Sequence, residues 1–126
     1  MLIAFLAIGC GAALGAWLRW GLGLWLNPIF PTLPYGTLAA NLLGGYLIGL
    51  AMAFFAHSPG LPAEWRLFLV TGLLGGLTTF STFSAEIFTL ISRNQLGWAI
   101  TASAAHLLGS LAMTGLGVWT FRLLRY

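Results

Sequence analysis

The chain has 126 residues, of which 60% are hydrophobic and only 6% are charged. A soluble domain carries about 25% charged residues, so this composition excludes a soluble globular protein and indicates one that lies in a bilayer. The net charge of +3 comes from dispersed arginines, a distribution that argues against nucleic acid as a partner.

Four apolar segments are long enough to cross a membrane, which takes about 20 residues for a helix. Proline, glycine and asparagine punctuate the short breaks between them. The predicted spans are 2–26, 35–56, 66–91 and 97–121. We therefore predict an all-α membrane protein with a single four-helix transmembrane domain, residues 1–126.

The first span lacks a basic stretch before its apolar run and contains Arg19, so we expect a retained helix rather than a secretory signal. Two roles for Arg19 stay open. Its side chain snorkels to the lipid headgroups, or it forms a positive vestibule that concentrates an anion. Cys10, the only cysteine, is expected to be a small buried residue in helix packing.

The third span contains the most informative segment, because residues 72–84 read GLLGGLTTFSTFS. Glycines and hydroxyl residues at this density predict a helix that breaks near the centre of the span. An unpaired backbone N–H or C=O in hydrocarbon costs several kcal/mol unless protein, water or an ion binds it. We therefore expect a site or a pathway here, with Phe80 and Phe83 set among hydroxyls.

Polar side chains form stripes on three spans, because residues three and four positions apart share a helix face. The stripes are Thr37 and Asn41 in the second span, Thr79, Thr82, Glu86 and Thr89 in the third, and Ser103, His106, Ser110 and Thr114 in the fourth. Two interpretations stay open. The hydroxyls bind helix backbone, their own or a neighbour's, or the stripes line a polar route, which ionisable residues inside a span usually mark.

Three pairs of glycines have the spacing G-x-x-x-G, which lets helix backbones approach closely. They are Gly11 and Gly15, Gly45 and Gly49, and Gly72 and Gly76. We expect tight helix contacts both within the chain and between subunits.

The distribution of arginines gives almost no preference for one orientation of the chain in the membrane. With the N-terminus inside, three arginines fall on the inner side and two on the outer side, a weak bias by the positive-inside rule. One interpretation is a small protein with its N-terminus inside, and the other is a chain that inserts in both orientations.

Enzyme chemistry finds little support. A hydrolase built from Ser81, Glu86 and His106 would need a nucleophile elbow that the sequence lacks. Metal sites normally take three or four side-chain ligands, which these residues do not supply. We therefore predict a protein that is not an enzyme.

The segment 75–86, GGLTTFSTFSAE, closely resembles the signature of the CrcB/Fluc fluoride channel family. Two further pieces match in order, GAALGAWLR at 11–19 and GTLAANLLG at 36–44. The resemblance covers the whole chain. It implies an antiparallel, dual-topology homodimer in the bacterial cytoplasmic (inner) membrane. Two pores would pass F⁻ passively out of the cytoplasm and so prevent fluoride toxicity.

The resemblance also implies roles for individual residues. Phe80, Phe83 and Asn41 match the pore-lining residues, and Arg19 matches the vestibule arginine. The backbone carbonyls of Gly75 and Thr78 match those that hold a structural, non-transported Na⁺ at the dimer centre. The polar track and its surroundings correspond to Ser81, Thr82, Glu86, Ser110 and Thr114. In the family, a residue of the fourth span that faces the track is often tyrosine. We assign His106 to that position here.

Physical arguments that do not depend on the family also favour an anion route between two antiparallel copies. The interior of a four-helix bundle is filled by side chains, so an aqueous route fits better between subunits. Carbonyls freed at the breaks of two copies would share one cation. The positive edges of the rings of Phe80 and Phe83 would face a small anion.

Two other classes of protein remain alternatives. A proton-coupled small multidrug-type antiporter would need a membrane carboxylate, for which Glu86 is the only candidate, whereas that family carries its acid in the first span. A non-transporting membrane assembly factor would leave the polar stripes unexplained.

Overall fold

The computed structural model describes residues 1–125, and their regular elements are helices. Helix α1 (Leu2–Leu26) continues into a short 3₁₀ turn, η1 (Asn27–Ile29), and α2 (Tyr35–Ala56) follows. The next elements are α3 (Ala63–Arg66), the π-helical segment η2 (Leu67–Leu74), α4 (Gly75–Leu77) and α5 (Ser81–Ser92). The last helix is α6 (Leu96–Leu124).

Four stretches are long and apolar enough to cross a membrane. They are Leu2–Ile29, Tyr35–Ala56, Ala63–Ser92 and Leu96–Leu124, each within a few residues of a predicted span. The all-helical, four-span part of the predicted fold is therefore confirmed.

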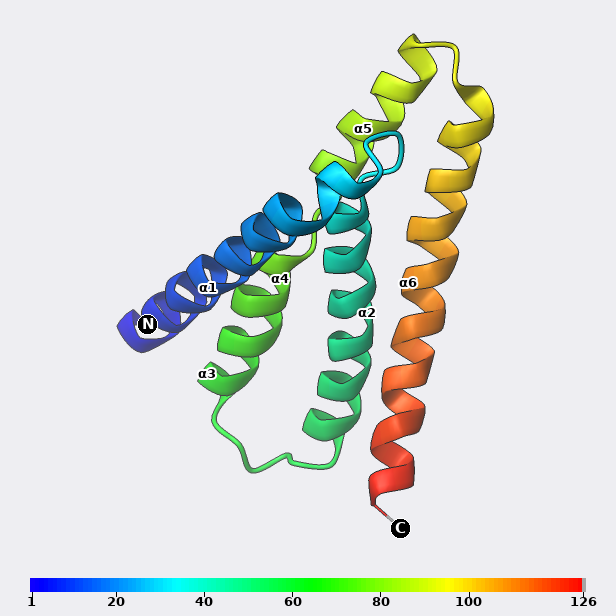
Figure 1. Cartoon of the computed structure of the whole chain (residues 1–126). Helices are drawn as coiled ribbons and strands as arrows, with labels where there is room; N and C mark the ends of the chain where they lie inside the picture. The colour runs from blue at the N-terminus through cyan, green and yellow to red at the C-terminus, as the bar shows by residue number, and fades with distance from the viewer. Residues whose placement is uncertain (126) are drawn as a thin grey trace.

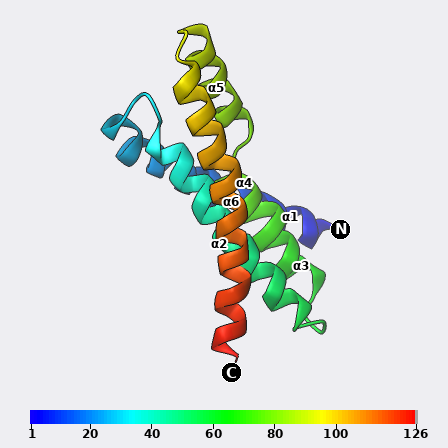
Figure 2. The ribbon, with the colours of Figure 1, turned by 90° about the vertical axis from the view of Figure 1, so that its right-hand side faces the viewer.

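The helices form two closely packed pairs. Helix α2 lies beside α6 along much of its length, and α1 packs on η2 and α4 (Figure 1). In the view turned by 90°, α1 crosses the other helices obliquely (Figure 2). Helix α5 lies beside the first part of α6, beyond the N-terminal end of α2 (Figure 1).

Glycine allows both pairs to approach this closely. A Cβ on Gly72 would lie 2.8 Å from Ile8 O and 3.0 Å from Gly11 Cα. A Cβ on Gly45 would lie 2.8 Å from Ser110 O. The predicted G-x-x-x-G pairs thus pack helices of the same chain against one another, and the contacts expected between subunits stay a prediction.

The connection from α1 to α2 is held by one side chain. Asn27 Oδ1 accepts hydrogen bonds from the backbone N–H groups of Gly36 at 2.7 Å and of Thr37 at 3.2 Å. These amides belong to the first turn of α2, where no intrahelical acceptor exists. Asn27 therefore caps the N-terminus of α2, at the residue where the polar stripe of this helix begins, Thr37.

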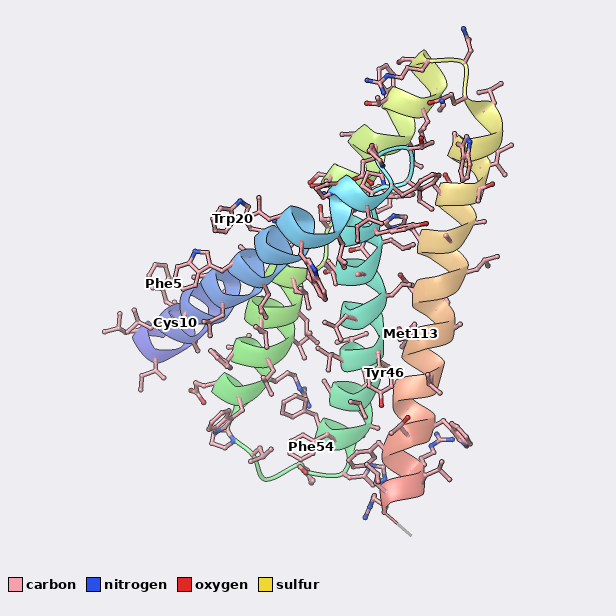
Figure 3. All side chains as sticks on the ribbon, in the orientation of Figure 1. Phe5, Cys10, Trp20, Tyr46, Phe54 and Met113 are labelled. Carbon is pink, nitrogen blue, oxygen red and sulfur yellow. The ribbon has the colours of Figure 1, made fainter. Side chains whose placement is uncertain are left out.

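Cys10 corrects one expectation. Its side chain is exposed rather than buried, on the stretch of α1 that also carries the exposed Phe5 and Trp20 (Figure 3). The reason is geometric: the face of α1 that packs on η2 and α4 is made by Gly11 and Gly15, the two buried residues of this helix. Cys10 lies beside that face and not on it.

The helix of the third span is interrupted at Thr78. Thr78 has extended backbone, with φ −85° and ψ 156°, so α4 ends at Leu77 and α5 begins at Ser81. Residues 78–80 lie between these two helices, and Thr79 among them lines cavities together with Arg19 of α1, Asn41 of α2 and His106 of α6.

Candidate functional site

The side-chain amide of Asn41 on α2 binds both the N–H and the carbonyl of Thr79. Its Oδ1 accepts a hydrogen bond from the N–H of Thr79 at 2.8 Å, and its Nδ2 donates to the carbonyl of Thr79 at 2.9 Å. One side chain thereby satisfies two backbone groups that would be costly to leave unpaired in a bilayer. This pair joins α2 to the non-helical residues of the third span.

The same amide reaches α6. Asn41 Nδ2 lies 2.9 Å from His106 Nδ1, and the imidazole lies 4.5 Å from the ring of Phe83, centroid to centroid. Phe83 in turn meets Phe80 edge to face, with 5.6 Å between centroids and 64° between ring planes. The structure thus brings together four predicted pore residues from three elements of the fold.

Two carbonyls at the end of α4 lose their usual helical partners. The N–H that a continuous helix would direct to Gly75 O belongs to Thr79, and it binds Asn41. The N–H that would serve Thr78 O belongs to Thr82, and it binds Thr79 Oγ1 at 3.0 Å. Carbonyl oxygens are suitable ligands for a hard cation, so the backbone at Gly75 and Thr78 fits the predicted Na⁺ site.

Side chains offer no competing metal site within residues 1–125, where no group of three or more His, Cys, Asp or Glu residues is found. The hydroxyl proton of Thr78 is bound by Leu74 O at 2.8 Å.

Arg19 also binds at the end of α4. Its Nε donates to Gly76 O at 3.1 Å, and it lines a cavity of about 510 Å³ together with Thr37, Thr79 and Thr82. The half-buried guanidinium therefore lies beside a polar cavity and binds a carbonyl whose helical partner would have come from Phe80. This position agrees with a vestibule and does not require snorkelling.

A second cavity, of about 500 Å³, collects most of the predicted pathway. It is lined by the predicted residues Asn41, Gly75, Thr78, Phe80, Phe83, His106, Ser110 and Thr114. Thr79 lines this cavity and the Arg19 cavity alike. Thr79, whose backbone Asn41 binds, therefore borders both cavities.

Glu86 and Ser81 lie outside this cavity. Glu86 Oε2 accepts a hydrogen bond from Thr37 Oγ1 at 2.6 Å and lines a third cavity, of about 430 Å³, with Thr82 and Arg93. Ser81 is exposed and lies 3.4 Å from Thr79 Oγ1, hydroxyl to hydroxyl. The predicted track is thus divided between two sides of the Asn41–Thr79 pair.

Several hydroxyls of the stripes bind helix backbone, as one of the two interpretations expected. Thr89, Ser103 and Thr114 donate to the carbonyl four residues earlier. Thr114 Oγ1 also lies 2.9 Å from Gly45 O on α2, so its single proton is shared between the carbonyls of Ser110 and Gly45. These hydroxyl protons are therefore committed to the protein, and the polar route would depend on other donors.

Sequence reasoning underestimated Thr79 and missed Asn27. Thr79 was one member of a stripe, yet its backbone binds Asn41 and its hydroxyl binds the N–H of Thr82. Its place three residues after Gly76, in the run of glycines and hydroxyls, was the available signal. Asn27, the cap of α2, lies in a connection where polar residues are ordinary, so no pattern distinguished it.

A family model described as CrcB-like protein, Camphor Resistance (CrcB), matches residues 6–118. Three relatives, each described as a fluoride-specific ion channel FluC, align over nearly the whole chain. The one from Thiobacillus denitrificans is 61% identical over 97% of this chain and 98% of its own. The one from Nitrosospira multiformis is 63% identical over 96% and 94%, and that from Tolumonas auensis is 61% identical over 99% and 98%.

Proposed function

Because this chain belongs to the CrcB-like protein family, we propose that it is a fluoride-selective channel that lets F⁻ leave the cytoplasm passively and so prevents fluoride toxicity. The family resemblance inferred from residues 75–86 is confirmed by the family match. The relatives are ion channels rather than enzymes, which confirms that expectation as well. Four spans and channel relatives together make this a multi-pass membrane protein.

The observation that carries the proposal is the cavity of about 500 Å³ that joins Phe80 and Phe83 to His106 and Ser110. A small anion sheds water only where other positive groups replace its hydration. Ring edges carry partial positive charge, and imidazole and hydroxyl groups donate hydrogen bonds. The lining contains no carboxylate, since Glu86 lies in a different cavity.

The proposed assembly is an antiparallel, dual-topology homodimer. Phe80 is 79% exposed in the single chain, although it lines the cavity of about 500 Å³ and contacts Phe83. A second copy inserted the other way would cover this ring and close the cavity into a pore between subunits. The nearly balanced arginines, three against two, favour insertion in both orientations.

The proposed structural Na⁺ would lie where the third spans of the two copies cross. The carbonyls of Gly75 and Thr78 would hold it, because the N–H groups that would otherwise bind them go to Asn41 and to Thr79 Oγ1. The cation supplies positive charge and backbone ligation at the dimer centre. Arg19 adds fixed positive charge in the adjoining vestibule.

The proposed location is the cytoplasmic (inner) membrane of a bacterium, since the relatives come from bacteria. Membrane lipid would cover the exposed apolar side chains of the four spans. Glu86 fits a proton-coupled antiporter poorly, because its carboxylate is bonded to Thr37 and shares a cavity with Arg93.

Ion flux from proteoliposomes that contain only this protein tests the proposal. We expect rapid F⁻ efflux, far slower Cl⁻ efflux, and no proton-driven uptake of a cationic dye. Dye uptake driven by a proton gradient would instead support the antiporter. Vesicles as tight to F⁻ as protein-free vesicles would support the assembly factor.

A further inference from the structure

The imidazole of His106 has one nitrogen paired and one nitrogen without a partner. The residue is only 5% exposed, and Nδ1 lies 2.9 Å from Asn41 Nδ2. Among residues 1–125, Nε2 is buried and makes no hydrogen bond. A buried polar atom without a partner is uncommon in native proteins and calls for a physical reason.

The orientation of the Asn41 amide is determined by the backbone of Thr79. The N–H of Thr79 requires an acceptor, which makes the facing atom Oδ1, and the carbonyl of Thr79 requires a donor, which makes the other atom Nδ2. Rotating the amide by 180° would set donor against donor and acceptor against acceptor. The NH₂ group therefore faces His106.

We infer that Asn41 is a positioning residue that locks His106 in the tautomer with its proton on Nε2. The two amide protons of Asn41 go to Thr79 O and to His106 Nδ1. Nδ1 must accept, so it carries no proton, and the ring proton of a neutral imidazole lies on Nε2. A doubly protonated ring is excluded by the same geometry, because its Nδ1–H would point at an NH₂ group.

This inference deepens the proposed function and rests on it for the identity of the ligand. His106 lines the cavity that contains Phe83 and Ser110, and its Nε2–H is the ring donor that the described residues leave without a partner. Asn41 has no amide proton left for an anion, because both are used by the protein. Of the Asn41–His106 pair, His106 is thus the member that can offer F⁻ a hydrogen bond, and Asn41 acts through it.

His57 provides an internal reference of the opposite kind. Its Nδ1 lies 2.8 Å from the carbonyl oxygen of Ala53, so this nitrogen must carry a proton. These two are the only histidines of the chain. One protein therefore contains two imidazoles whose Nδ1 atoms are expected to differ in protonation.

Nitrogen-15 solid-state NMR of the full dimer in lipid bilayers, with ring-labelled histidine, measures this directly. Protonated and unprotonated ring nitrogens differ widely in chemical shift, and a His57→Gln variant assigns the remaining signals to His106. We expect unprotonated Nδ1 and protonated Nε2 for His106, with protonated Nδ1 for His57. A proton on Nδ1 of His106 in the wild-type protein would overturn the inference without any further variant.

Substitution of Asn41 tests its positioning role. In Asn41→Asp the carboxylate offers only acceptors, so we expect the His106 proton to move to Nδ1. The matched control is Thr37→Val, one turn earlier on α2, which removes the bond to Glu86 and should leave the His106 spectrum unchanged. An unchanged tautomer in Asn41→Asp would show that Asn41 does not determine it.

Potassium fluoride, with potassium chloride as the control, tests the ligand. We expect added F⁻ to shift the Nε2 resonance of His106 and Cl⁻ to leave it in place. No response to F⁻ would remove His106 as the donor. Failure of F⁻ flux in proteoliposomes would refute the proposed function instead, since the tautomer is measured independently of transport.

Discussion

Gly15 on α1 offers a sharp test of how the packing of the first span supports the site. A Cβ at this position would contact Leu73 O and would lie 2.7 Å from Leu77 N and 3.0 Å from Gly76 C. All three are backbone atoms, so no side-chain rotation relieves the contact. The helices would have to separate by roughly 1 Å to restore ordinary van der Waals distances of about 3.5–4.0 Å.

The expected cost of Gly15→Ala follows from two opposing terms. Overpacking a tight contact costs about 1–3 kcal/mol, and replacing glycine by alanine inside a helix returns about 0.5–1 kcal/mol. Because the contacts are all with backbone atoms, the upper half of the first range applies, and we expect a net loss of about 1–2.5 kcal/mol in the free energy of unfolding. Because Arg19 follows one turn later and donates to Gly76 O, the same displacement should also lower F⁻ flux.

Unfolding by SDS titration in mixed micelles, followed by the fluorescence of the six tryptophans, measures the stability. Gly21→Ala is the matched control on the same helix, because a Cβ there would meet nothing within 4 Å. It should be neutral or slightly stabilising. Equal stability of Gly15→Ala, Gly21→Ala and the wild-type protein would refute the packing of α1 on η2 and α4 described here.

Three further predictions concern the pore and the assembly. Phe80→Ile and Phe83→Ile should each cut F⁻ flux while size-exclusion chromatography still shows a dimer, because ring edges that face the anion are lost while apolar bulk is kept. Replacing Na⁺ by a larger organic cation on both sides should lower flux or dimer stability, whereas Thr78→Ser should behave like the wild type, because the backbone is the proposed ligand. Two lysines added at the N-terminus should impose one orientation and abolish flux, which a co-expressed copy of opposite bias restores.

Each of these predictions has a contradicting outcome. Normal flux in both phenylalanine variants would remove the rings from the mechanism, and loss of the dimer would assign them a packing role, for which truncation costs about 3–5 kcal/mol. Indifference to the cation would count against the Na⁺ site. Full activity from a uniformly oriented population would refute the antiparallel assembly.

Local patterns were enough to predict the four spans and to select the segment at the centre of the site. Runs of about 20 apolar residues define membrane helices because the bilayer sets their length. The glycine and hydroxyl run at 72–84 directed attention to the stretch where α4 ends and α5 begins. Residues 75–86 also carried the family resemblance, since they form one contiguous motif.

Other features depended on which helix faces which. Cys10 was expected to be buried and is exposed, because burial of a residue on α1 depends on its angle to Gly11 and Gly15, the buried residues of that helix. Hydropathy is nearly uniform around this helix, so the G-x-x-x-G spacing of Gly11 and Gly15 is the signal in the sequence for the packed face. Cys10 lies about 100° from Gly11 around an α-helix and therefore outside that face. The same uncertainty left two roles open for Arg19, which the structure places at the end of α4 and beside a polar cavity.

The sequence by itself determined that the chain is a membrane protein of four helices and where its unusual residues lie, because composition and spacing act over a few neighbouring positions. Only the tertiary structure paired Thr37 with Glu86, Asn41 with Thr79, and Asn41 with His106, across 49, 38 and 65 residues of sequence. Hydrogen bonds between groups that distant in sequence depend on the rotation and depth of each helix against its neighbours. Those quantities arise from packing at glycine contacts, which no single span specifies alone.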